Sequence, residues 1–212
     1  MRSFLSFVLI CSAFVCSAQE VPDFPDYRNK KESFAKVSEK YIKADLASFT
    51  IGGLDESIGK TPLKKISPFA YTRNMMNFKQ DDITVTVTTV PFNASGKKIQ
   101  KVGEHVVKID GKPFYGSFGQ MPITAIESVK VLWGKDTIEI PRIAYFDLYN
   151  LNFTYKDKAG TERTSNGVYF SPDGKRMYIY MLSKNEEGSY EVTWVIEDKK
   201  YFRRVLDWGF TK

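Results

Sequence analysis

Cysteine and histidine are almost absent from this sequence. Its 212 residues include two cysteines, Cys11 and Cys16, and one histidine, His105. A zinc site built from these residue types needs three or four of them, so the chain beyond Cys16 cannot form one. A Ser-His-Asp triad could use only His105 as its base, and no Gly-x-Ser-x-Gly turn is present to display a serine. We therefore predict no metal, no cofactor and no catalysis by cysteine or histidine.

Phosphate-binding and calcium-binding loops are missing as well. Residues 53–61 read GLDESIGKT, with five residues between the two glycines where the phosphate-binding motif has four. Pro62 follows directly and leaves no room for a helix that begins at Lys60. No stretch has the ligand spacing of an EF-hand loop. Only carboxylates and binding surfaces are left as sources of function.

The first eighteen residues have the pattern of a secretory signal peptide. Arg2 precedes an apolar stretch over residues 4–15, and small residues at 16–18 form a cleavage site. The apolar stretch is shorter than the roughly 20 residues that a membrane-spanning helix needs. We predict cleavage before Gln19, which makes the mature protein secreted or periplasmic, without cysteine and without stable insertion in a membrane.

The rest of the chain reads as a linker, one helix and many strands. Residues 19–31 contain two prolines among charged residues and predict a flexible linker, and residues 32–212 predict a single domain. Between residues 32 and 49 apolar side chains recur at helical spacing, and Gly52-Gly53 ends the pattern. This spacing predicts one amphipathic helix that packs on a larger body.

From residue 83 onward the apolar pattern has a period of two. Residues 83–90 read ITVTVTTV, a β-branched alternation typical of a half-buried strand. Asp110-Gly111, residues 134–136 and residues 171–174 carry turn signals between further runs. The fold class is therefore predicted to be mainly β: an antiparallel β-sandwich or barrel of about nine to ten strands with the N-terminal helix packed on it.

The last three predicted strands, over residues 176–182, 190–196 and 201–207, are rich in aromatic side chains. If Leu182 pairs with Tyr190, and Ile196 with Tyr201, one sheet face carries Tyr178, Tyr180, Trp194 and Arg203. Rigid aromatic side chains with polar tips suit sugar rings and protein partners, so these four are the predicted ligand-binding residues. The alternative is that both faces are buried, and a register slip of one residue would exchange the faces.

Positive charge is in modest excess, with a formal net charge of +6. Residues 199–204 read KKYFRR, which could attract a polyanion or form a solvated turn whose arginines pair with nearby acids. We favour the second interpretation because the excess is small for this length. An exported protein seldom meets nucleic acid, so no nucleic-acid partner is predicted.

The poor catalytic inventory beside an aromatic sheet predicts an exported, non-catalytic module that binds a glycan or an envelope or extracellular protein. Two alternatives stay open. A carboxylate-dependent hydrolase acting on polysaccharide or cell-envelope material would need two acids roughly 5–9.5 Å apart. Asp147 and Asp207 are the candidates, because aromatic residues surround them in the sequence. A structural or assembly subunit would need an exposed strand edge or an apolar patch that joins chains.

Overall fold

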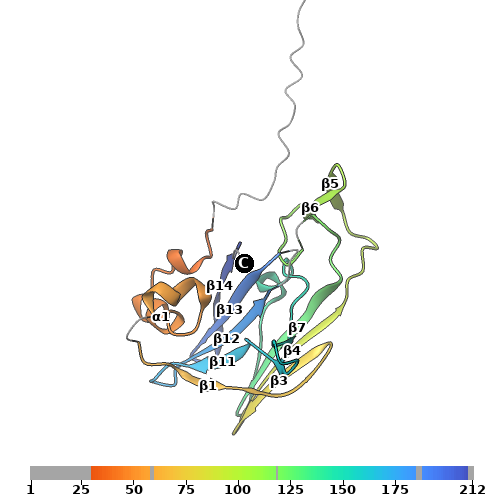
Figure 1. Cartoon of the computed structure of the whole chain (residues 1–212). Helices are drawn as coiled ribbons and strands as arrows, with labels where there is room; N and C mark the ends of the chain where they lie inside the picture. The colour runs from red at the N-terminus through yellow and green to blue at the C-terminus, as the bar shows by residue number, and fades with distance from the viewer. Residues whose placement is uncertain (1–29, 58–59, 118, 185–187, 210–212) are drawn as a thin grey trace, which may run out of the picture.

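The computed structural model describes residues 30–57, 60–117, 119–184 and 188–209. The predicted signal peptide, its cleavage site and residues 19–29 of the predicted linker lie outside the described residues. Within the described part the chain is mainly β, with antiparallel pairing in every named sheet (Figure 1).

Two five-stranded sheets make up most of the domain. Sheet 1 has the order β1-β11-β12-β13-β14, formed by Lys64–Ile66, Gly167–Phe170, Arg176–Ser183, Tyr190–Glu197 and Lys200–Trp208. Sheet 2 has the order β2-β3-β4-β7-β8, formed by Pro68–Thr72, Met75–Gln80, Ile83–Pro91, Thr124–Trp133 and Asp136–Glu139. Two hairpins are separate from them: β5 (Ile99–Val102) with β6 (His105–Ile109), and β9 (Tyr155–Lys156) with β10 (Glu162–Arg163).

The fourteen strands of the described residues exceed the nine or ten predicted. The extra strands are short, and β1, β2 and all but the last residue of β3 lie in residues 54–79, which show no clear period in the sequence. The turn at residues 134–136 joins β7 and β8 as expected, with Trp133 opposite Asp136. The expected hairpin around Asp110-Gly111 is reduced to one bridge between Ile109 and Lys112, because β6 pairs with β5 instead.

The main core lies between the two sheets. Strand β4 shows why: Val85 and Val87 are fully buried, while the intervening threonines are half exposed on the opposite face. From sheet 1 the core receives Met177, Ile179 and Trp194, all without exposed area. Apolar side chains from facing sheets thus remove one another from water, which is the principal stabilising term of such a fold.

A second buried cluster lies on the other face of sheet 1. There Phe34, Ile42 and Leu46 pack with Tyr178 and Tyr180. Figure 1 shows α1 beside sheet 1, on the side away from β3, β4 and β7. The apolar stripe of the helix and the tyrosines of the sheet therefore bury each other.

The N-terminal segment, defined here as residues 30–57, differs from the single helix predicted over residues 32–49. It contains the short helices η1 (Phe34–Lys36) and η2 (Ile51–Glu56) on either side of the seven-residue α1 (Lys40–Leu46). The cause is tertiary hydrogen bonding: the Phe34 amide donates to the Asp207 side chain, and the Glu32 carbonyl accepts from the Leu206 amide. Backbone groups committed to β14 cannot also form helical bonds, so tertiary contacts override the local helical pattern.

The predicted register of the last three strands is wrong by one residue in two places. Tyr190 lies opposite Ser183, not Leu182, so β13 is shifted against β12. Ile196 does lie opposite Tyr201, but a bulge then places Trp194 opposite Arg204. Because successive side chains point to opposite faces, Trp194 lies in the main core while Tyr178, Tyr180 and Arg203 lie on the helix side.

Candidate functional site

The predicted ligand-binding residues do not form an exposed surface. Tyr178 and Trp194 have no exposed area, and Tyr180 is only 3% exposed. Trp194 lies on the opposite face of sheet 1 from the two tyrosines, and its indole Nε1 donates to the Ala144 carbonyl at 3.0 Å. The prediction of one shared aromatic binding face is therefore corrected: the faces were misassigned, and both are covered.

Tyr178 binds the chain's own N-terminal segment. Its hydroxyl donates to Oδ2 of Asp45 on α1 at 2.5 Å, and Arg176 Nε lies 3.3 Å from the same oxygen. Burial raises the pKa of the Tyr178 hydroxyl, and the neighbouring Asp45 carboxylate raises it further. The hydroxyl therefore stays protonated and keeps its role as a donor across the physiological pH range.

Tyr180 is engaged in the same interface. Its hydroxyl donates to Glu191 Oε2 at 2.8 Å, and the same carboxylate accepts the amides of Ile51 at 2.8 Å and Gly52 at 2.7 Å. Burial raises the pKa of Glu191, although these three hydrogen bonds act in the opposite direction. The carboxylate thus satisfies the backbone of η2, which would otherwise lack acceptors at this end.

Asp207, one of the two candidate catalytic acids, lies directly across from Glu191 in the register. Its Oδ2 accepts the Phe34 amide at 2.8 Å, and burial raises its pKa. A Cβ at Gly52 would stand 3.0 Å from Glu191 Oε1 and 3.2 Å from Asp207 Oδ2. The backbone of Gly52 therefore fills the place where a substrate would have to meet these two acids.

Asp147, the other candidate acid, is bound by Arg204. The guanidinium donates to its two oxygens at 2.6 and 2.9 Å, in a bidentate arrangement with both side chains about nine-tenths buried. Nη2 of Arg204 also forms an ion pair with Oε2 of Glu32 at 2.7 Å. Both oxygens of the Asp147 carboxylate are therefore already occupied by Arg204, and neither is left for a substrate.

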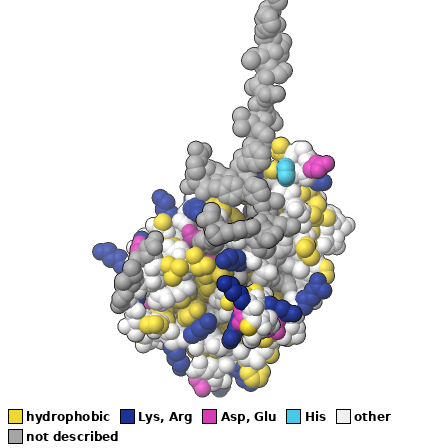
Figure 2. Space-filling view, in the orientation of Figure 1, with side chains coloured by type: hydrophobic (Ala, Val, Ile, Leu, Met, Phe, Trp, Pro, Cys, Tyr) yellow, Lys and Arg dark blue, Asp and Glu magenta, His cyan; other side chains and the backbone are white. Residues whose placement is uncertain are grey.

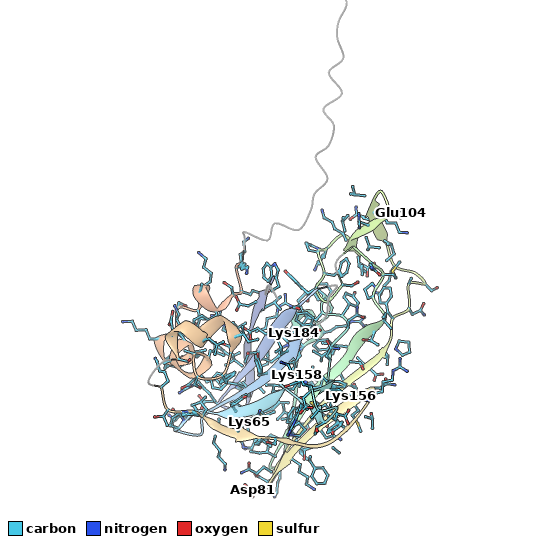
Figure 3. The ribbon with its side chains drawn as sticks, in the orientation of Figure 1. Lys65, Asp81, Glu104, Lys156, Lys158 and Lys184 are labelled. Atoms are coloured by element: carbon cyan, nitrogen blue, oxygen red, sulfur yellow. The ribbon has the colours of Figure 1, made fainter. Side chains whose placement is uncertain are left out.

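Both arginines of residues 199–204 are paired, although not with Glu191 or Glu197, the acids nearby in the sequence. Lys199 lies 2.7 Å from Asp136, and Arg203 lies 3.0 Å from Glu39. Other lysines remain without an ion pair to any described residue. On the face in Figure 2, Lys and Arg side chains gather near the middle, and Figure 3 places Lys156, Lys158 and Lys184 there.

One surface depression, which we call the β2 groove, has a volume of about 700 Å³. Its walls include Tyr71, Arg73, Ile123, Asn152, Thr154 and Glu162. Tyr71 and Ile123 are 42% and 68% exposed, so apolar surface is available to a ligand. Nothing in the periodic patterns of the sequence marks these residues, because they come from an edge strand, two connections and a short hairpin.

Hydrogen bonds fix the shape of the β2 groove. Glu162 of β10 accepts from the Thr154 hydroxyl at 2.7 Å and from the Tyr71 hydroxyl at 3.3 Å. Asn150 has a φ of 51°, and its side chain accepts the amides of Ile123 and Thr124 at 2.8 and 3.0 Å. The aromatic ring and the polar floor are thus positioned before any ligand arrives.

A second depression, of about 510 Å³, lies at the other end of β3 from the β2 groove. It is lined by Trp133 and Phe170, whose rings meet edge to face at 5.6 Å, and by two prolines and several aliphatic side chains. It offers fewer polar groups than the β2 groove. A ligand that needs many hydrogen bonds fits the β2 groove better.

No protein-family model, curated protein or solved structure matches this chain. Among the described residues, no group of three or more His, Cys, Asp and Glu side chains is placed to hold a metal ion. The helices in the described part are all too short or too polar to cross a membrane. The function must therefore be argued from the side chains themselves.

Proposed function

We propose that this chain is an exported, non-catalytic β-sandwich module that binds a glycan in the β2 groove, with the N-terminal segment packed on sheet 1 as a permanent cover. One observation carries the proposal: an exposed tyrosine, Tyr71, stands in a 700 Å³ groove among amide, hydroxyl, carboxylate and guanidinium groups. Binding sites for small ligands combine an apolar surface with a few placed polar groups in volumes of about 300–1,000 Å³.

The chemistry of a sugar matches these walls. The faces of a sugar ring carry C–H groups that pack on an aromatic ring such as that of Tyr71. Its hydroxyls can donate to the Glu162 carboxylate and exchange hydrogen bonds with Asn152. Because Glu162 already fixes the Tyr71 hydroxyl, the ligand has to order few side chains, which reduces the entropic cost of binding.

The test is a glycan screen of the mature protein followed by calorimetry with the best ligand. Tyr71→Ala should weaken binding at least tenfold, because buried aromatic contacts dominate such interfaces. Phe202→Ala is the matched control: Phe202 is 44% exposed on β14, outside the groove. Equal affinities for wild type and Tyr71→Ala would refute the site, and a folded protein that binds no glycan would refute the function.

Export is tested separately. The amino terminus of the protein recovered from cells that express the full chain should begin at Gln19, in the periplasmic or secreted fraction. Recovery from the cytosol with Met1 intact would contradict export without bearing on the groove.

The hydrolase alternative has one observation in its favour, the neighbouring Glu191 and Asp207 with raised pKa values. Catalysis there would require the N-terminal segment to leave sheet 1. Release of reducing ends from envelope polysaccharide, lost in both Glu191→Gln and Asp207→Asn while the variants stay folded, would support a hydrolase over a binding module.

The assembly alternative is favoured by β2. It is an edge strand without charged residues, and its Phe69 is 71% exposed. Such edges pair with other chains unless something blocks them. Light scattering on the mature protein should show a monomer if binding is the function; a stable oligomer dispersed by Phe69→Lys would support assembly.

A further inference from the structure

A third depression, of about 350 Å³, lies where residues 110–114 meet residues 142–149. Lys112 follows the Asp110-Gly111 turn at the end of β6, and Arg142 begins η3 (Arg142–Ala144). Lys97 enters from the chain just before β5. Figure 1 shows the β5–β6 hairpin reaching beyond the ends of the two sheets. The residues that line the cavity come from the end of this hairpin, from η3 and from the connections next to them.

Three cationic side chains face this cavity. Lys97 is paired with Asp110 at 3.0 Å. Lys112 Nζ stands 4.5 Å from the centre of the Phe146 ring, and neither Lys112 nor Arg142 forms an ion pair with any described residue. Both are exposed at the rim. Two positive charges are therefore free to meet a ligand.

The acids of the cavity are already committed. Asp147 is held by both arms of Arg204, and Asp110 is bound by the Lys97 ammonium and by the amide of Lys98 at 2.9 Å. The hydrogen bond from Lys97 lowers the pKa of Asp110, and the positive charge of Arg142 contributes in the same direction. The acids are thus neutralised by partners of their own, and the field at the rim stays positive.

Apolar surface completes the cavity. Phe114 and Tyr149 form buried walls, with their rings edge to face at 5.8 Å, and Ile143 is 63% exposed at the mouth. Burial raises the pKa of Tyr149 to about 12, so its hydroxyl adds no negative charge. A ligand with one charged end and one carbon-rich body would fit both features.

We propose that this cavity binds a small organic anion, a carboxylate-bearing sugar or a molecule of similar size, whose carboxylate is held by Arg142 and Lys112. The guanidinium can bind a carboxylate through two parallel hydrogen bonds, and the ammonium supplies a second positive charge. The carbon-rich part of the ligand packs on Phe114 and Phe146. This site is separate from the β2 groove and does not rest on the function proposed for it.

The experiment is a two-dimensional NMR titration of the mature protein with glucuronate, with glucose as the neutral probe of the same size. Glucuronate should shift amide signals of residues 110–114 and 142–149, and glucose should not shift them. Added salt should weaken the binding, because it screens exposed charges. Glucose binding at the same residues with equal affinity, or no saturable binding of glucuronate at millimolar concentration, would overturn the proposal.

Four variants of equal charge change sharpen the result. Arg142→Gln and Lys112→Gln should each weaken glucuronate about tenfold, the loss expected for one charge-assisted hydrogen bond. Lys101→Gln on β5 and Lys40→Gln on α1 remove the same charge outside both proposed sites and should leave the affinity unchanged. Equal weakening in all four would mean general attraction to a positive protein and would refute a defined site.

The two proposed sites can fail independently. Tyr71→Ala should weaken glycan binding in the β2 groove at least tenfold and leave the glucuronate shifts at residues 142–149 intact. Arg142→Gln should weaken glucuronate binding about tenfold and leave glycan binding in the β2 groove unchanged. Loss of both activities in either variant would contradict the separation of the two sites.

Discussion

Tyr178→Phe removes one oxygen atom from the interface between the N-terminal segment and sheet 1. That oxygen donates to the Asp45 carboxylate at 2.5 Å and accepts from Arg176 Nε at 3.1 Å. The Asp45 and Arg176 side chains are 12% exposed, so water compensates little for the loss. A hydrogen bond to a charged group in such a place contributes about 1.5–3 kcal/mol to the free energy of unfolding.

The assay is unfolding in urea, monitored by circular dichroism. Tyr178→Phe should lower the free energy of unfolding by about 1.5–3 kcal/mol, which corresponds to a melting temperature lower by roughly 3–12 °C for a domain of this size. Tyr155→Phe deletes the same atom from a side chain that is 53% exposed and should change stability by less than about 0.5 kcal/mol.

A double-mutant cycle with Asp45→Ala then isolates the contact. The two changes should couple by about 1–2 kcal/mol, because both destroy the same hydrogen bond. Coupling below about 0.5 kcal/mol, or equal effects of Tyr178→Phe and Tyr155→Phe, would refute the claim that the tyrosine face of sheet 1 is occupied by the chain's own N-terminal segment.

Three further outcomes follow from the packing. A Cβ at Gly116, whose φ is +95°, would collide with the Tyr149 carbonyl oxygen, so Gly116→Ala should fail to give soluble folded protein. Gly111→Ala, also at positive φ but with no atom near its Cβ, should cost only about 1 kcal/mol in urea unfolding, and similar losses for both would contradict the backbone geometry. Trp194→Ala should lower the free energy of unfolding by about 3–5 kcal/mol but leave the glycan affinity unchanged below the melting temperature. Weaker glycan binding by the folded variant would instead indicate that Trp194 is a binding residue. Burial raises the folded pKa of Glu191 above 4.5, so its contribution to stability is greatest below pH 4.5 and is lost as the pH rises through the folded pKa. The free energy of unfolding of Glu191→Gln should therefore fall less steeply with pH than that of the wild type. Parallel dependences on pH would refute a buried acid at this position.

The alternation of apolar and polar residues was enough to predict a strand such as β4, which has one buried and one exposed face. The alternation in residues 83–90 predicts β4 correctly, with Val85 and Val87 buried and threonines between them. The turn at residues 134–136 likewise joins the two strands that flank it. These features depend on neighbours within a few residues, and such neighbours are visible in the sequence.

Register was not predictable in the same way. Ser183 lies opposite Tyr190, one residue away from the predicted pairing, and a bulge after Val195 places one extra residue in β14. Neither choice leaves a periodic signal, but each reverses the faces of the strand that follows. The same alternation of side chains therefore predicts opposite surfaces when the pairing changes by one residue.

The apolar stripe of the N-terminal segment and the tyrosines of β12 bury each other in the fold, although each lacks an evident partner in the sequence. The apolar stripe of residues 32–49 needs a surface to cover, and the tyrosines of β12 need both apolar contact and acceptors for their hydroxyls. The N-terminal segment supplies Ile42 and Leu46 for the rings and Asp45 for the hydroxyl of Tyr178. An aromatic sheet face in a chain with an unassigned amphipathic helix is thus better interpreted as the partner of that helix than as a ligand surface.

This pairing also decides where a ligand can bind. With sheet 2 on one face of sheet 1 and the N-terminal segment on the other, the side chains of β12 and β13 are buried along nearly their whole length. The side chains that line the β2 groove and the third depression belong mainly to the edge strand β2, to the β9–β10 hairpin and to the connections around residues 110–114, 123–124 and 142–154. None of these segments is packed between two layers, so burial does not determine which of their side chains face a ligand. The residues that line the two proposed binding sites are therefore the ones that the alternation of apolar and polar side chains predicts least well.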